Sequence, residues 1–220
     1  MWADIDYMDD YKIFTIAQES YANLPQYVKE IRAKNMTFVP IMDVGVPVRK
    51  NTGYNALDWG LEEGIFIKQA LSDDPLTAGV WGNQAYFPDF FHPKAEAYWH
   101  EMWDTMLNTY GLEIDGIWID MNEASTHCDG YMKPDERPKN SLRNKPYYIP
   151  GQRDLEHLSI GVDGRHYNGF TEYDAHNTFA LLQVKATASY LESKGKRPFV
   201  LSRSNYPGLQ KFGFHWIGDN

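Results

Sequence analysis

The feature that most constrains the fold of this chain is a regular alternation of short apolar segments with longer segments of helical periodicity. Five apolar runs are rich in Ile, Val, Phe or Trp, and each is bounded by polar or turn residues. They cover residues 2–5, 38–42, 116–119, 199–202 and 215–217. Short runs of this kind are typical of strands that are buried on both faces of a parallel sheet.

Helical patterns occupy the segments between these runs. We expect helices over residues 24–34, 93–110 and 173–194, and the second begins with a proline and stops at Gly111. Strands that alternate with helices predict a parallel α/β architecture. Two long connections interrupt the alternation, residues 44–92 and residues 121–172, and the first is expected to contain a short hairpin around residues 64–69. Loops of that length are usually functional or ordered by their neighbours.

Composition excludes several classes of protein. Apolar residues make up 43% of the 220 residues and aromatic residues 15%, which is incompatible with a disordered or collagen-like chain. The net charge of −9 argues against a nucleic-acid partner. No apolar stretch approaches the roughly 18 residues of a membrane span, so no membrane contact is expected from this segment. A single cysteine, Cys128, excludes an internal disulfide; a free thiol and a bridge to a residue outside the chain both remain open.

Charged residues stand where the expected strands end. Asp4 and Asp6 stand at the end of the first run, Asp43 closes the second, Asp120 the third, Arg203 the fourth and Asp219 the last. In a (β/α)₈ barrel the active site is built at the carboxyl ends of the strands, so these side chains would converge. For Asp6 and Asp43 a structural role, either capping the following loop or pairing with Arg203, is equally favoured.

Asp120 and Asp219 are the stronger candidates for chemistry, because each follows an apolar strand that contains a tryptophan. Partial desolvation in such a place would raise the pKa of a proton donor. Two carboxylates in different environments are what the cleavage of a glycosidic bond requires.

Four segments together resemble the retaining α-glucosidases of glycoside hydrolase family 31, especially the group that contains sucrase–isomaltase, maltase–glucoamylase and lysosomal acid α-glucosidase. They are Trp2-Ala-Asp-Ile-Asp-Tyr-Met8, Gly116-Ile-Trp-Ile-Asp-Met-Asn-Glu-Ala-Ser125, Leu201-Ser-Arg-Ser204 and His215-Trp-Ile-Gly-Asp-Asn220. The resemblance implies an incomplete catalytic (β/α)₈ TIM barrel, with about strands 2 to 6 present and residues 1–220 forming part of a single domain.

The same resemblance implies the roles of individual residues. Asp120 would be the nucleophile and Asp219 the general acid/base, and no metal or organic cofactor is implied. Asp4 and Arg203 would hydrogen-bond sugar hydroxyls. The walls and surroundings of the pocket would comprise Trp118, Met121 and Trp216, with Ile5 near the entrance and Trp81 close by.

The expected activity is that of a retaining exo-α-glucosidase acting on the non-reducing ends of α-1,4-linked oligosaccharides, with α-1,6 linkages left open. Alternatives are an α-xylosidase or an α-glucan lyase of the same family, and a carbohydrate-binding barrel without catalysis. The resemblance suggests a lysosomal, lumenal or extracellular setting. Because an open barrel exposes sheet edges, we expect the chain to need the remainder of its barrel and to be inactive or to aggregate alone.

Overall fold

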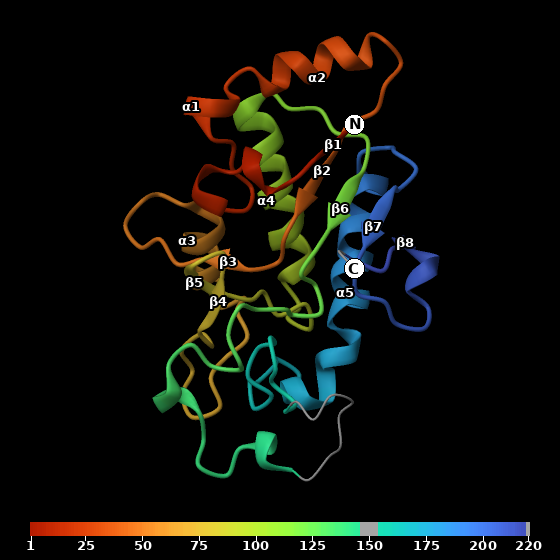
Figure 1. The fold of residues 1–220 in the computed structure, drawn as a ribbon. Coiled ribbons are helices and arrows are strands. Elements are labelled where there is room, and N and C mark those ends of the chain that lie inside the picture. The colour runs from red at the N-terminus through yellow and green to blue at the C-terminus, as the bar shows by residue number, and fades with distance from the viewer. Residues whose placement is uncertain (146–153, 219–220) are drawn as a thin grey trace. The chain divides into compact units, whose positions relative to one another are not determined.

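A computed structural model of the chain describes residues 1–145 and 154–218 (Figure 1). The chain divides into two compact units. The first unit comprises Met1–Val44, Glu96–Asn122 and Ala180–Asn220, and the second comprises Gly45–Ala95 and Glu123–Phe179. Each unit is thus assembled from segments that are distant in the sequence.

The first unit contains a parallel sheet of five strands. Their spatial order is β1 (Trp2–Ala3), β2 (Val39–Met42), β6 (Ile117–Ile119), β7 (Val200–Ser202) and β8 (Phe214–His215), and they run side by side in Figure 1. All five predicted strands are therefore confirmed, although β8 begins one residue earlier than expected. Strand β1 ends early because the Asp4 carboxylate accepts a hydrogen bond from the N–H of Ile5 at 2.7 Å and starts a 3₁₀ turn, η1 (Ile5–Tyr7).

The register of the sheet places the residues that follow its central strands at one edge. Met42 pairs with Ile119, Ile119 with Ser202, and Ser202 with His215. The next residue along each of these strands is one of the side chains named above: Asp43, Asp120, Arg203 and Trp216. The parallel arrangement therefore brings these strand-end residues to one edge of the sheet, as the sequence argument expects.

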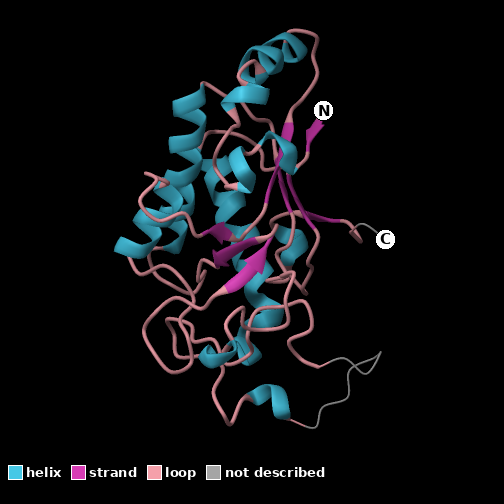
Figure 2. Cartoon of the chain, turned by 60° about the vertical axis from the view of Figure 1, so that its left-hand side comes forward, coloured by secondary structure: helices cyan, strands magenta, loops and turns pink. Residues whose placement is uncertain are grey.

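Helices cover the sheet of the first unit on one side, as the cyan ribbons to the left of the magenta strands show in Figure 2. They include α1 (Gln18–Tyr21), α2 (Leu24–Arg32), α4 (Ala95–Tyr110) and most of α5 (Glu172–Ser193), with a short 3₁₀ turn, η5 (Leu209–Lys211). Helices α4 and α5 are joined by the indole of Trp99, which donates a hydrogen bond to the Thr187 hydroxyl at 2.9 Å, and by Trp103, which stacks on Tyr190. Both tryptophans are fully buried and belong to the core.

The second unit is built largely from the two segments expected to be long connections. It contains α3 (Asn55–Glu62) and an antiparallel sheet with the order β3 (Val46–Pro47), β5 (Asn83–Tyr86), β4 (Ala78–Val80). Two 3₁₀ turns follow, η3 (Pro134–Glu136) and η4 (Leu142–Asn144). Strands β4 and β5 form a hairpin through Trp81 and Gly82, whose φ angles are 50° and 75°. Two successive positive φ values characterise the turn whose twist matches that of paired strands.

The predicted hairpin around residues 64–69 is wrong. Gly64, with φ of 66°, follows the end of α3, and the N–H of Ile65 donates to the carbonyl of Gly60 at 2.9 Å. This is the hydrogen-bonding pattern of a helix C-terminal cap. The following residues form only isolated bridges, from Phe66 to Pro88 and from Lys68 to Pro75. Gly64 therefore ends a helix and does not turn between two strands.

A chain of four titratable side chains, three of them buried, ties the second unit together. The His166 ring contacts Asp89 at 2.7 Å through Nδ1 and Glu172 at 2.8 Å through Nε2, and His176 Nδ1 contacts the other oxygen of Glu172 at 2.7 Å. Burial lowers the pKa of His166, but its hydrogen bonds to Asp89 and Glu172 outweigh burial and raise that pKa to about 9. Burial raises the pKa of Glu172, but its hydrogen bonds with His166 and His176 outweigh burial and lower that pKa below its ordinary range.

None of the helices in the described part of the chain is long and apolar enough to cross a membrane.

Candidate active site

An ion pair between Asp120 and Arg203 occupies the carboxyl ends of two neighbouring strands. Asp120 follows β6 and Arg203 follows β7, and the guanidinium Nη1 lies 2.9 Å from the carboxylate Oδ1. The Asp120 side chain is 8% exposed and that of Arg203 is 21% exposed, so solvent reaches the pair from one side. A charge-assisted hydrogen bond of this kind fixes both side chains in one orientation.

The backbone after Asp120 is strained in a way that holds the carboxylate. Met121 has a φ of 58°, and its N–H donates to Asp120 Oδ1 at 2.6 Å. The Met121 sulfur in turn lies 3.2 Å from Nη2 of Arg203. A non-glycine residue in the left-handed region costs on the order of 1 kcal/mol, and such residues cluster at functional sites. Asp120, Met121 and Arg203 therefore form one compact group, as the sequence predicts.

Asn122 and Ser202 support this group and were not recognised in the sequence. Asn122 is fully buried; its Nδ2 donates to the Ser202 hydroxyl at 2.8 Å, and its Oδ1 accepts the N–H of Ser204 at 3.0 Å. Asn122 thus contacts the side chain of the residue before Arg203 and the backbone of the residue after it. The strand-end argument rests on charged residues, and the roles implied by the resemblance do not extend to these two uncharged ones.

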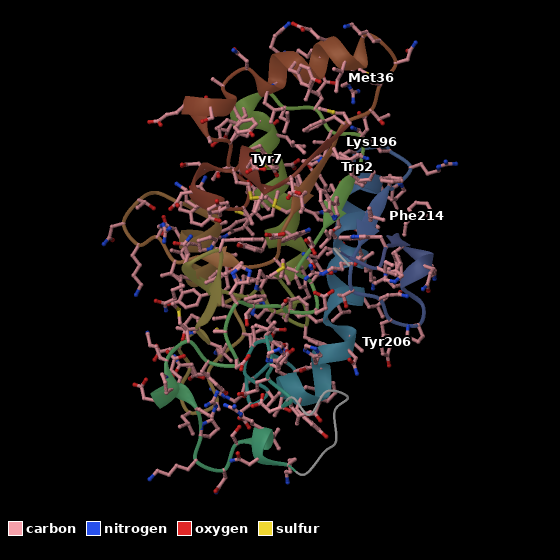
Figure 3. The ribbon with its side chains drawn as sticks, viewed as in Figure 1. Trp2, Tyr7, Met36, Lys196, Tyr206 and Phe214 are labelled. Atoms are coloured by element: carbon pink, nitrogen blue, oxygen red, sulfur yellow. The ribbon has the colours of Figure 1, made fainter. Side chains whose placement is uncertain are left out.

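Aromatic rings lie beside the ion pair on the same sheet. The Trp118 ring meets that of Trp216 edge-on at 5.6 Å and that of Trp2 at 6.1 Å. Phe199 continues the cluster, with its ring 6.0 Å from Trp2 and 5.3 Å from Phe214. Trp2 and Phe214, labelled in Figure 3, stand on the two edge strands and are about half exposed. Such rings can stack on the C–H faces of a pyranose.

The remaining predicted site residues are Asp4, Ile5, Trp81 and Asp219. Asp4 and Ile5 follow β1, which β2 separates from β6, and the Asp4 carboxylate is engaged in its local cap. Trp81 stands in the hairpin turn of the second unit, where its N–H donates to His127 Nδ1 at 3.3 Å. Asp219 lies outside the described residues. Gly218 approaches Arg203 so closely that an added Cβ would stand 2.8 Å from its Cδ.

Asp43 is buried beneath the strand ends, at 1% exposure. Burial and the negative charge of Asp43 both raise the pKa of the Tyr7 phenol, whose hydroxyl donates to the Ile41 carbonyl at 2.7 Å. Asp6, by contrast, is exposed. Within residues 1–145 and 154–218, no three His, Cys, Asp or Glu side chains are grouped so as to hold a metal ion.

Comparison with known families decides the class of this sheet. A model described as the glycosyl hydrolases family 31 TIM-barrel domain matches residues 1–220. The chain belongs to glycosyl hydrolase family 31. The predicted resemblance is thereby confirmed, and the parallel sheet with its helices is part of the (β/α)₈ barrel of that family.

Curated relatives of this family 31 chain are larger proteins. It is 37% identical to a probable alpha-glucosidase of Oryza sativa subsp. japonica, covering 100% of the chain and 24% of the relative. It is 33% identical to the lysosomal alpha-glucosidase of Mus musculus, covering 99% and 23%, and 33% identical to alpha-xylosidase 1 of Arabidopsis thaliana, covering 100% and 26%. The chain thus spans about a quarter of the length of these relatives.

Among solved structures, the alpha subunit of glucosidase II in its Glc1Man2-bound form superimposes on this family 31 chain with a TM-score of 0.80 at 24% identity. The match covers 100% of the chain and 21% of that subunit. At this identity the likeness supports the fold alone.

Proposed function

We propose that the protein is a retaining exo-α-glucosidase that releases glucose from the non-reducing ends of α-1,4-linked oligosaccharides. The observation that carries the proposal is the Asp120–Arg203 pair at the carboxyl ends of β6 and β7, where barrel enzymes build their active sites. The family membership and the alpha-glucosidase relatives support the same activity.

The proposed reaction proceeds by two displacements. The Asp120 carboxylate attacks the anomeric carbon while Asp219 protonates the glycosidic oxygen, and the aglycone leaves with that proton. The result is a glucosyl ester of Asp120 with inverted configuration. The Asp219 carboxylate then removes a proton from water, which attacks the anomeric carbon, breaks the ester and restores the α configuration.

Further residues are proposed to bind the sugar. Arg203 and Asp4 would hydrogen-bond its hydroxyls, and Trp118, Met121 and Trp216 would form the walls of the subsite. Ile5 would lie at its entrance and Trp81 near it. The contact between Arg203 Nη2 and the Met121 sulfur, together with the edge-on packing of Trp118 and Trp216, supports a preformed wall.

An α-xylosidase is the second candidate, because a relative with that name is 33% identical over the whole chain. The two activities differ in whether the subsite accepts the sugar's C6 hydroxymethyl group. Rates on p-nitrophenyl α-glucoside and p-nitrophenyl α-xyloside separate them, and we expect the glucoside to be the better substrate. The lysosomal relatives support a lysosomal, lumenal or extracellular location.

Covalent trapping in the full-length protein tests the proposed mechanism. An α-glucose-configured mechanism-based inactivator should add one sugar, and peptide mapping should locate it on Asp120. Asp120→Asn should abolish labelling, whereas Asp6→Asn, at an exposed carboxylate of the same unit, should leave it intact. Labelling of another carboxylate would overturn the assignment, and sugar binding without an adduct would indicate a non-catalytic barrel.

A further inference from the structure

A cavity of about 450 Å³ lies within the second unit, and none of its lining residues is a residue of the proposed active site. Its floor includes the buried side chains of Phe66, Asp89 and His166, and its exposed rim includes Arg165 and Tyr167. The volume falls within the usual range of small-molecule sites.

The charged side chains of this cavity are already paired with other groups of the protein. Glu63 is paired with Lys94, Arg165 with Asp73 at 2.9 Å, and Asp89 with His166 at 2.7 Å. A charged ligand would have to compete with these pairs and lose its own hydration. A neutral ligand with several hydroxyl groups meets donors and acceptors without that cost. The lining therefore favours a neutral, hydroxylated compound.

Tyr167 gives the cavity a ring against which such a compound can stack. It is 64% exposed, yet it is held in place: its N–H donates to Asp89 Oδ2 at 2.6 Å, and its ring meets that of His92 edge-on at 4.6 Å. An aromatic face that is fixed and exposed beside polar groups suits the C–H face of a sugar ring.

Two glycines keep the rim open. Gly64 and Gly169 line the cavity, and a Cβ added to either would meet nothing within 4 Å. A chain of linked sugars could therefore pass the rim instead of ending inside the cavity. A sugar polymer fits this geometry better than a small compound that must be fully enclosed.

We propose that this cavity is a second carbohydrate-binding site, which holds a neutral α-glucan chain through Tyr167. The choice of an α-glucan rests on the proposed function, whereas the preference for a neutral sugar rests on the cavity itself. None of its lining residues belongs to the first unit, so the site can bind a chain independently of Asp120 and Arg203.

Affinity electrophoresis of the full-length protein through gels that contain soluble starch tests this proposal. The variants are Tyr167→Ala, Tyr167→Phe, which keeps the ring, and Tyr173→Ala, at an exposed tyrosine of the same unit that does not line the cavity. We expect Tyr167→Ala to weaken the apparent binding of starch about three- to tenfold, as the loss of one ring contact predicts. The other two variants should migrate like the unsubstituted protein.

Hydrolysis of maltose, measured in parallel, separates the two proposals. We expect kcat/KM for maltose to be equal in all four proteins, because maltose needs only the strand-end site. If none of the four proteins hydrolyses maltose, the proposed function is refuted. Starch binding then tests the cavity proposal by itself. Three results would overturn the second site. They are retardation of Tyr167→Ala equal to that of the unsubstituted protein, a loss of starch binding in Tyr173→Ala equal to that in Tyr167→Ala, and competition with starch by inorganic phosphate instead of by maltose.

Discussion

The two units of this chain use their charged side chains in opposite ways. In the first unit, Asp120 and Arg203 meet at the ends of two strands, and the Arg203 side chain keeps 21% of its surface exposed. In the second unit, His166 and Glu172 have no exposed side-chain surface, and both ring nitrogens of His166 are engaged. A pair at an open edge can exchange its partner for a ligand. His166 and Glu172 are buried against each other and hold chain segments together.

Replacing the strand-end carboxylate should produce the largest effect on activity. Asp120→Asn keeps the shape of the side chain but removes the nucleophile, so we expect kcat on an α-glucoside to fall on the order of 10⁴-fold. The melting temperature should change little, because Arg203 stays partly solvated. Steady-state kinetics and thermal unfolding of the full-length protein measure both. A large loss of stability with retained activity would reverse our assignment of roles.

Replacing the buried histidine should have the converse effect. His166→Leu leaves the Asp89 and Glu172 carboxylates buried without their shared partner, which we expect to cost about 3–5 kcal/mol of unfolding free energy. The fraction that remains folded should keep its kcat. Denaturant unfolding measures the cost. His157→Gln is the matched control: His157 is partly exposed and pairs with the exposed Asp129, so its loss should cost less than about 1 kcal/mol.

The same cluster predicts a pH dependence of stability. The pKa of His166 is raised from 6.5 to about 9. Its contribution to stability is therefore fully present below pH 6.5 and is lost as the pH rises through about 9. The loss should amount to about 3 kcal/mol. The pKa of Glu172 is lowered, so its contribution to stability is present above its ordinary pKa and is lost as the pH falls.

Unfolding followed between pH 4 and pH 10 checks this profile, and His166→Leu should flatten its alkaline limb. An alkaline limb that persists unchanged in the variant would show that another group is responsible.

A smaller effect is expected at the hairpin of the second unit. Gly82 has a φ of 75°, so Gly82→Ala should destabilise the protein by about 1–2 kcal/mol. Gly79 lies on the preceding strand, and a Cβ there would make an ordinary contact with the Cys128 sulfur at 3.5 Å. Gly79→Ala should therefore be close to neutral. Equal costs in thermal unfolding would mean that packing, and not the turn, limits this hairpin.

The sequence predicts the first unit well because one physical signal dominates it. Buried parallel strands are continuous apolar runs, and the helices between them carry a single apolar stripe. The ends of α4 and α5 fall within about two residues of their expected positions. The Asp120–Arg203 contact follows in turn, since parallel neighbours in register bring the residues after them together.

The second unit is poorly predicted because its order depends on partners far away in the sequence. The sequence predicts only a long connection where α3 and the hairpin of β4 and β5 stand, and a turn at Gly64 where α3 ends. A tryptophan in a left-handed conformation, as at Trp81, gives no propensity signal. No local sequence pattern predicts the contact between Asp89 and His166 either. Buried polar pairs of this kind belong to the fold and cannot be read from either segment alone.

The separation of that pair also bears on how the chain is made. Asp89 and His166 are 77 residues apart, and a ribosome adds about 5–20 residues each second. Residues 45–95 therefore emerge several seconds before the histidine that completes their core. During that interval Asp89 is a solvated carboxylate in an unfinished segment, while β2 and α2 have already been synthesised. Strands β1 and β2 can begin to pair early, whereas the core of the second unit must wait for its own second half.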